Sequence, residues 1–147
     1  MALGRLINGT WTTEWTERDE SGQFKRMPTL FHHWITADGS SGFKAEPGRY
    51  HLYVSLACPW AHRTLIFRRL KGLEAMIPLS VVHWHMAEQG WTFAPGPGVV
   101  ADPIHGADYL HQVYTAADAH YSGRVTVPVL WDCERATVVS NESSEII

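Results

Sequence analysis

The sequence predicts an α/β domain in which a β-α-β unit, a long insertion and a β-β-α unit follow one another. An apolar, β-rich run over residues 49–57 is followed by a run with helical spacing over 59–73 and a second apolar run over 77–85. Two further β-rich runs, 125–132 and 136–141, are joined by a tight turn and predict an antiparallel hairpin. The closing NESSEII has the composition of a helix start.

The first 48 residues show no sustained periodicity and are interrupted by Gly, Pro and Ser, so we expect an extended N-terminal segment lying over the domain. The domain itself is expected over 49–147. In its first helix Ile66, Leu70 and Leu73 share a face, and Gly72 helps to end the helix. A strand, a helix and a second strand in this order predict a right-handed βαβ unit with parallel strands.

The insertion, residues 86–124, is rich in Gly, Pro and Asp and is expected to hold one short helix near 107–119. Long insertions in compact domains usually serve a site. Ser140 or Asn141 is the expected cap of the final helix, whose start the chain barely passes. We therefore expect an N-terminal piece of a longer protein, truncated in its last helix. The predicted order of elements is that of the thioredoxin-like fold.

Composition excludes several classes of function. A net charge of −3 without a dense Lys/Arg cluster argues against nucleic-acid binding. No apolar run approaches the roughly 18 residues of a membrane helix, and the N-terminus lacks a signal core. Two cysteines do not make a disulfide framework, so a reducing cytoplasm is expected. The nine histidines are scattered without further metal ligands, so no metal site is predicted.

Cys58 is the candidate nucleophile. Pro59 suits the first helical position, which makes Cys58 the N-cap, where free N–H groups and the helix dipole favour a thiolate. Ala61 stands where a Cys-x-x-Cys motif has its second cysteine, and Cys133 lies between acidic residues that disfavour its thiolate. A single active thiolate needs a second thiol from solution, and glutathione is the obvious supply in a cytoplasm. The alternative is a buried, unreactive cysteine.

Two further motifs fit a tripeptide ligand. Val127 before Pro128 must be extended, and thioredoxin-like proteins have a cis bond here, which would turn the Val127 backbone towards a peptide added as a short strand. The alternative is an ordinary edge-strand proline. At Glu142 and Ser143 a helix start offers N–H groups, a hydroxyl and a carboxylate to the two charges of a γ-glutamyl group. Taken alone, this motif is only a cap.

The stretches CPWAHR, GWTF, GRVTVPVLWD and VSNESSEII, in this order and spacing, resemble the N-terminal half of the glutathionyl-hydroquinone reductases, the xi-class glutathione transferases. The resemblance runs from about residue 31 to 147. It implies that Cys58 is the nucleophile, that Trp91 packs against glutathione, and that Glu142 and Ser143 hold its γ-glutamyl end. It also implies that one run binds the ligand's backbone and glycine end, with Arg124 supplying charge: Arg124, Val125, Thr126, Val127 and Pro128.

The expected function is therefore removal of glutathione from S-glutathionyl-hydroquinones through a Cys58–glutathione mixed disulfide. Glutathione is the expected co-substrate, a glutathionylated quinone-type aromatic the partner substrate, and a homodimer the expected full-length assembly. By the same resemblance, we expect the family's helical C-terminal domain, with its quinone pocket, to be missing from the 147 residues given. Two alternatives stay open: a thiol transferase of the omega or glutaredoxin type, and a non-catalytic glutathione-binding module.

Overall fold

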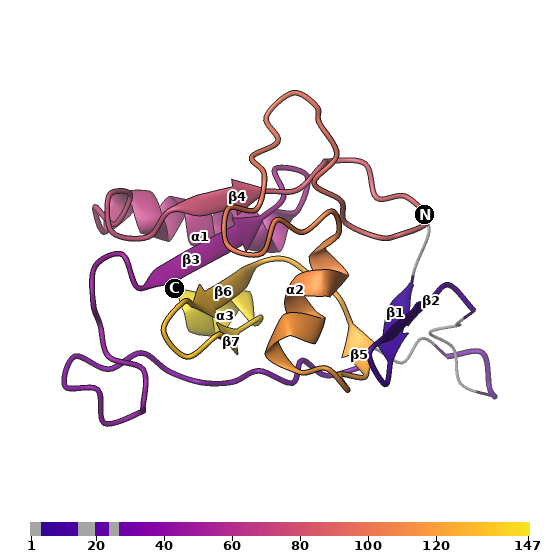
Figure 1. Cartoon of the computed structure of the whole chain (residues 1–147), viewed down its shortest axis with the longest axis horizontal. Coiled ribbons are helices and arrows are strands. Elements are labelled where there is room, and N and C mark those ends of the chain that lie inside the picture. The colour runs from indigo at the N-terminus through magenta and orange to yellow at the C-terminus, as the bar shows by residue number, and fades with distance from the viewer. Residues whose placement is uncertain (1–3, 15–19, 24–26) are drawn as a thin grey trace.

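A four-stranded sheet in the order β4-β3-β6-β7 forms the centre of the molecule (Figure 1). The computed structural model describes residues 4–14, 20–23 and 27–147. The strands β3 and β4 are parallel, whereas β6 is antiparallel to both β3 and β7. The predicted parallel pair and the predicted hairpin are thus confirmed. The strand bounds are β3 Tyr50–Val54, β4 Leu79–Val81, β6 Val129–Asp132 and β7 Thr137–Ser140.

A second, three-stranded sheet has the order β2-β1-β5 and joins the N-terminal segment to the domain. Its strands are β1 Arg5–Ile7, β2 Thr10–Thr12 and β5 Gly123–Arg124. The sequence predicted no strand before residue 49. The two-residue turn Asn8-Gly9 has positive φ at both positions, 47° and 77°, as a type I′ hairpin requires. A Cβ at Gly9 would lie 2.0 Å from the Ala119 carbonyl oxygen, so only glycine fits there.

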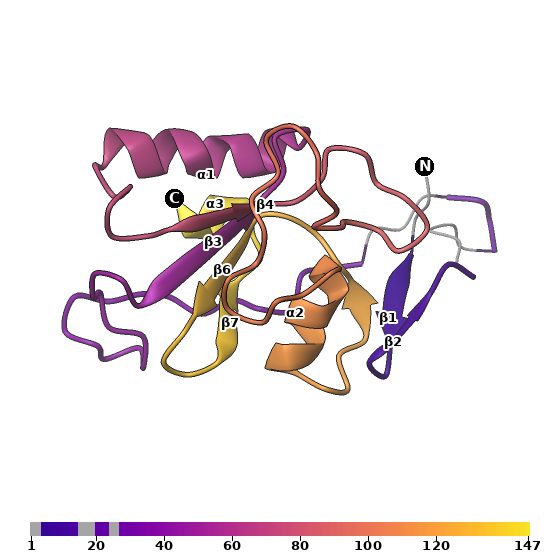
Figure 2. The same cartoon turned by 45° about the horizontal axis from the view of Figure 1, so that its top comes forward.

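Helices cover both faces of the central sheet (Figure 2). On one side α1 and α3 lie next to each other, and α2 lies on the opposite side (Figures 1 and 2). The bounds are α1 Pro59–Leu70, α2 Leu110–Ala117 and α3 Ser143–Ile146. The helix predicted within the insertion is therefore confirmed as α2.

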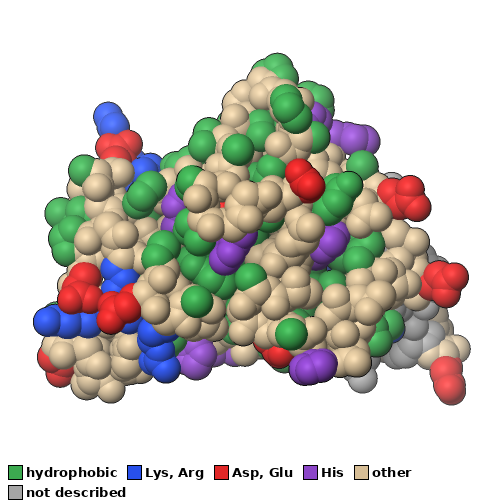
Figure 3. All heavy atoms as spheres, viewed as in Figure 1, with side chains coloured by type: hydrophobic (Ala, Val, Ile, Leu, Met, Phe, Trp, Pro, Cys, Tyr) green, Lys and Arg blue, Asp and Glu red, His purple; other side chains and the backbone are tan. Residues whose placement is uncertain are grey.

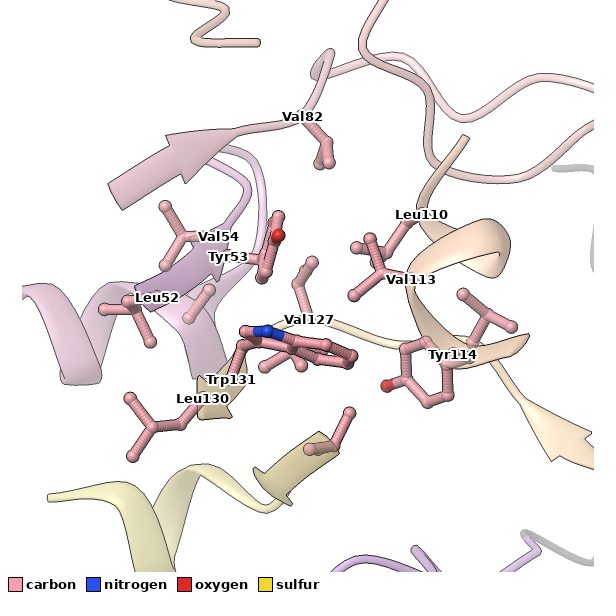
Figure 4. Close-up of a cluster of buried hydrophobic side chains, with 14 of the residues drawn as sticks. Leu52, Tyr53, Val54, Val82, Leu110, Val113, Tyr114, Val127, Leu130 and Trp131 are labelled. Carbon is pink, nitrogen blue, oxygen red and sulfur yellow. The ribbon is translucent and has the colours of Figure 1, made fainter. Parts of the chain in front are cut away.

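The core lies in two layers, one on each side of the sheet (Figure 4). Leu52 and Leu130 are paired in the β3/β6 register and point towards the α1 side. Tyr53 and Trp131, both at most 1% exposed, point to the other side and meet α2. All five residues of β3 are buried, as expected for a central strand covered on both faces.

The apolar face predicted for α1 is not its buried face. Ile66 and Leu70 are 45% and 77% exposed, whereas the fully buried positions of α1 hold Ala61 and Thr64. The helix ends at Leu70, and Gly72 follows with φ 65°, in the left-handed region where glycine is favoured. Because the buried positions carry small side chains, the spacing of large apolar residues did not reveal them.

A groove of about 550 Å³ lies beside α1 and α3, and Phe67, Met76 and Ile146 are among its lining residues. On the face in Figure 3, the Lys and Arg side chains gather at the end that carries the loop before β3, away from the N-terminal hairpin. Within the part of the chain that the structure describes, every helix is too short or too polar to cross a lipid bilayer.

Candidate functional site

Cys58 lies at the junction of β3 and α1 and forms the N-cap of the helix, with Pro59 in the first turn, as predicted. Its backbone is extended (φ −103°, ψ 117°), and its carbonyl accepts the first helical hydrogen bond from His62 N at 3.0 Å. The half-buried Sγ lies 3.7 Å from the Val127 carbonyl oxygen, to which the thiol donates. The sulfur is therefore at the positive end of α1 and partly accessible.

The Val127-Pro128 peptide bond is cis, which confirms the expectation drawn from the thioredoxin-like fold. Both residues are buried and directly precede β6. The 3.7 Å contact with Cys58 places this peptide opposite the thiol. Cys58 and Val127, which are 69 residues apart in the chain, therefore lie on facing walls of the candidate site.

The start of α3 is capped by Glu142, and not by Ser140 or Asn141 as predicted. The Glu142 carboxylate accepts from Ser144 N at 3.4 Å and from Ser144 Oγ at 3.3 Å. Ser140 is still part of β7, and its Oγ accepts from Glu142 N at 3.1 Å. The strand ends at Ser140, one residue before the predicted end, and the helix begins at Ser143, one residue later than a cap at Asn141 would place it.

Two buried polar atoms at this helix start lack a hydrogen-bond partner among the described residues: Ser143 Oγ and Asn141 Oδ1. A buried hydroxyl without a partner is costly, and such groups often belong to a site that a ligand completes. Both residues line the pocket described next. A ligand carboxylate there would accept a hydrogen bond from Ser143.

A pocket of about 220 Å³ opens beside the thiol. All nine residues named from the sequence line it: Cys58, Trp91, Arg124, Val125, Thr126, Val127, Pro128, Glu142 and Ser143. It thus brings together residues from four separate stretches of the chain. Arg124 and Glu142 supply opposite charges to its wall.

Five further lining residues were not predicted as site residues: Gly4, Trp11, Trp60, Met86 and Asn141. Trp60 and Asn141 lie within the motifs CPWAHR and VSNESSEII, so their place in the sequence already suggested proximity to the site. Gly4, Trp11 and Met86 carry no such signal, because only the tertiary fold brings them to the pocket.

The hydroxyl of Tyr114, on α2, connects two walls of the pocket. It donates to the Thr126 carbonyl at 2.8 Å and accepts from Thr126 N and from Asn141 Nδ2, both at 3.2 Å. Burial raises the pKa of Tyr114, so the phenol stays protonated and remains a donor. The Tyr114 hydroxyl therefore connects the run 124–128, which ends in the cis-proline, to Asn141.

Replacing Tyr114 with Phe is expected to lower the free energy of unfolding by about 1–3 kcal/mol, because one buried and two partly buried polar groups lose their hydrogen bond. It should also weaken glutathione binding by loosening both walls. Urea denaturation and calorimetric titration with S-methylglutathione measure the two effects. Thr115→Val, on the exposed turn of the same helix, serves as the control. An unchanged unfolding free energy in Tyr114→Phe would contradict this role.

The N-terminal segment also reaches α3. His32 Nδ1 lies 2.8 Å from Glu145 Oε1, and Glu145 Oε2 accepts from Ser140 Oγ at 2.8 Å. The hydrogen bond with Glu145 is the main cause that raises the pKa of His32. This contact fixes the N-terminal segment beside the helix start that carries Glu142 and Ser143.

Cys133 is exposed, follows β6 and does not line the pocket. Desolvation, followed by the charges of Asp132 and Asp102, raises the pKa of its thiol. The direction agrees with the sequence prediction, but burial contributes more than the acidic neighbours, of which Asp132 takes part and Glu134 does not. Among the described residues, no group of three or more His, Cys, Asp or Glu side chains is arranged to hold a metal ion.

A helix-capping cysteine facing a cis-proline across the edge of such a sheet defines a thioredoxin-like thiol domain. Residues 57–147 match the family model described as "Glutathione S-transferase, N-terminal domain", and the chain belongs to this family.

Curated relatives are similar over nearly the whole chain. It is 54% identical over 153 residues to the glutathionyl-hydroquinone reductase YqjG of Escherichia coli (strain K12), covering 99% of this chain and 47% of that protein. It is 55% identical over 146 residues to the glutathionyl-hydroquinone reductase PcpF of Sphingobium chlorophenolicum, covering 99% and 45%. The chain thus spans about half the length of the curated relatives it matches.

Solved structures confirm the thioredoxin-like α/β fold. The Xi class GST from Natrialba magadii superposes with a TM-score of 0.88 at 48% identity, over 99% of this chain and 43% of that chain. The glutathione-bound structure of YqjG superposes with a TM-score of 0.83 at 52% identity, over 97% and 43%.

Proposed function

We propose that this chain is the glutathione-binding, thiol-bearing half of a reductase that removes glutathione from S-glutathionyl-hydroquinones. The observation that carries the proposal is one pocket containing the Cys58 thiol, the cis Val127-Pro128 peptide and the partnerless Ser143 hydroxyl. Two relatives more than half identical to the chain are named glutathionyl-hydroquinone reductases, and one is described with glutathione bound.

The pocket offers a complementary group to each part of glutathione. The Val127 backbone faces Cys58 and is suited to pair with the cysteinyl residue of a bound peptide. The Glu142 carboxylate attracts the γ-glutamyl ammonium, while Ser143 donates to the carboxylate. Arg124, at the other end of the 124–128 run, attracts the glycyl carboxylate. With these ends fixed, the ligand's sulfur lies beside Cys58, and Trp91 covers its side.

The reaction proceeds in two steps, cleavage of a carbon–sulfur bond followed by a thiol–disulfide exchange. The Cys58 thiolate attacks the sulfur of the S-glutathionyl adduct and forms an S–S bond while the bond from sulfur to the aromatic carbon breaks. That carbon takes the electron pair and a proton, which releases the hydroquinone, and a Cys58–glutathione disulfide remains. A second glutathione thiolate attacks this disulfide, giving oxidised glutathione and free Cys58. The helix start favours Cys58 as the leaving thiolate.

The choice of cysteine supports thiol removal over conjugation of glutathione to electrophiles. A serine or tyrosine at this position stabilises the glutathione thiolate but cannot form a disulfide with it. Cys133 does not line the pocket and is disfavoured as a thiolate, so it is not suited to resolve a disulfide at Cys58. The second thiol therefore comes from solution, which also supports a cytoplasmic, reducing location. By its resemblance to the family, the full-length protein is expected to be a homodimer.

Comparing three substrates tests the proposal in the complete protein. Glutathionyl-menadiol, a glutathionylated peptide and dehydroascorbate are each supplied with excess glutathione, and the products are followed by chromatography. We expect the glutathionyl-hydroquinone to have the highest kcat/KM. A higher kcat/KM for the peptide or for dehydroascorbate would replace the proposal with a transferase of the omega or glutaredoxin type. Binding of glutathione without any turnover would replace it with a non-catalytic module.

A further inference from the structure

Trp11 belongs to the N-terminal hairpin, far along the chain from the thiol motif, yet it lines the same pocket as Cys58. It also lies outside residues 57–147, the part that matches the family model. The match to the family model therefore assigns no role to Trp11.

The hairpin is held firmly against the strand that carries Arg124. Leu6 pairs with Trp11 on one side and with Gly123 on the other, and Arg5 pairs with Arg124. At the turn, Asn8 N donates to Ser122 Oγ at 2.7 Å and Gly9 N donates to the Tyr121 carbonyl at 2.9 Å. The backbone of Trp11 thus lies two strand spacings, about 10 Å, from β5.

The pairing also fixes the direction of the indole. Residues directly opposite on neighbouring strands place their side chains on the same face of a sheet. Leu6 is 1% exposed and belongs to the core, so Trp11 points to the same, inner face.

The indole is anchored on several sides before any ligand arrives. Nε1 donates to the Glu88 carbonyl at 3.0 Å, and the ring stacks on His111 with centroids 4.9 Å apart and an angle of 19°. Gly4 and Gly90 have no side chain where the ring passes: added Cβ atoms would lie 2.1 and 2.9 Å from it. A ring fixed in this way loses little further conformational freedom when it contacts a ligand.

The position of Trp11 within the pocket indicates which part of the ligand it meets. The 3.7 Å contact between Cys58 and Val127 marks the thiol. Arg124 precedes Val127 by three residues, which is up to about 10 Å along an extended chain. Arg124 therefore marks the end of the pocket that lies away from the Cys58 thiol. Trp11 is joined to β5 through β1, where it shares a sheet face with Gly123, the residue before Arg124. Its ring lies against Gly90, the neighbour of Trp91, and both Trp11 and Arg124 line the pocket.

We infer that Trp11 closes the glycyl end of the glutathione site and makes it selective for a tripeptide that ends there. This inference rests on the proposed glutathione site. The indole packs against the glycyl residue while Arg124, which lines the same pocket, attracts its carboxylate, and an additional residue would have to pass the indole. The N-terminal hairpin is in this way a wall of the binding site.

Calorimetric titrations of the complete protein with three S-methylated peptides test the inference, because they bind without reacting at Cys58. The peptides are S-methylglutathione, its analogue without glycine, and its analogue extended by one glycine. Wild-type protein is expected to bind the extended peptide at least about tenfold more weakly than S-methylglutathione, since the indole blocks its path. Equal affinities would overturn the inference without any variant.

Trp11→Leu is expected to bind S-methylglutathione about tenfold more weakly while its affinity for the analogue without glycine stays within about twofold. Trp11→Phe keeps an aromatic ring, so its affinity for S-methylglutathione should fall less than that of Trp11→Leu. Trp34→Leu is the control, because Trp34 is a tryptophan of the same segment that lines the other groove. An equal loss for both peptides in Trp11→Leu would show a merely structural role and overturn the inference. If wild-type protein binds none of the peptides, the proposed glutathione site itself fails, and the inference falls with it.

Discussion

Replacing Cys58 with serine is expected to lower the rate of glutathionyl-hydroquinone reduction by a factor of at least about 10³, as removal of a covalent nucleophile does in other enzymes. A serine hydroxyl has nearly the same size but forms no disulfide with glutathione, so the first exchange has no product. The rate of hydroquinone release, followed by its absorbance under excess glutathione, measures the effect.

Two controls separate chemistry from binding in this prediction. Cys58→Ser should keep its affinity for S-methylglutathione within about threefold, because the other walls of the pocket are unchanged. Cys133→Ser should keep wild-type turnover, because Cys133 is exposed and outside the pocket. Turnover by Cys58→Ser above about a tenth of the wild-type rate would contradict the mechanism.

Replacing Arg49 with Met is expected to lower the free energy of unfolding by about 3 kcal/mol, because it leaves a buried carboxylate without its counter-charge. Arg49 Nε and Nη2 donate to the two oxygens of Asp132 at 3.0 and 2.7 Å. The Asp132 side chain is 0% exposed and that of Arg49 only 9%. Met keeps much of the stem of Arg49 and removes only the charged head. Urea denaturation of the complete protein gives the difference.

Arg69→Met is the matched control for this loss. Its ion pair with Glu74 is as short, 2.7 Å, but the two side chains are 76% and 45% exposed. Exposed pairs of this kind contribute about 0–1 kcal/mol, because water and salt screen them. If both variants lowered the free energy of unfolding equally, the claim that burial makes the Arg49–Asp132 pair important for stability would be wrong.

The same pair predicts how stability changes in acid. Burial raises the pKa of Asp132, but the hydrogen bonds from Arg49 and from the backbone N–H groups of Glu134 and Arg135 outweigh it, and the net pKa is lowered. A carboxyl group with a lowered folded-state pKa stabilises the fold above its unfolded pKa, about 3.9, and loses that contribution as the pH falls through the folded value. The difference between wild type and Arg49→Met should therefore shrink in this acidic range. A difference that grows there would show that another group dominates.

The residues of the site that could be predicted are those whose function depends on local sequence. Cys58 before Pro59 specifies a helix cap, and Val127 before Pro128 specifies an extended residue at the start of a strand. Such patterns need only a few neighbouring residues, together with the family resemblance, to indicate their place. All of these residues do lie around one pocket.

The parts that could not be predicted depend on contacts between distant segments. Trp11 reaches the pocket only because β1 pairs with β5, more than a hundred residues later. Asn8-Gly9 was a local hairpin signal that the prediction missed, but the pairing of this hairpin with β5 has no local signal. The buried face of α1 was missed because Ala61 and Thr64 are small, while the larger Leu70 is exposed. The cap of α3 was placed too early because the Glu142 carboxylate, and not a Ser or Asn side chain, accepts from Ser144 N.

Peptide mapping by mass spectrometry tests the central claim, that the Cys58 sulfur takes up glutathione from the substrate, most directly. The complete protein is mixed with an equimolar amount of glutathionyl-menadiol without free glutathione, quenched in acid and digested. We predict that the hydroquinone is released and that the peptide containing Cys58 carries glutathione. We also predict that this peptide loses its bound glutathione when free glutathione is added. Release of the hydroquinone with that peptide unmodified would contradict the account.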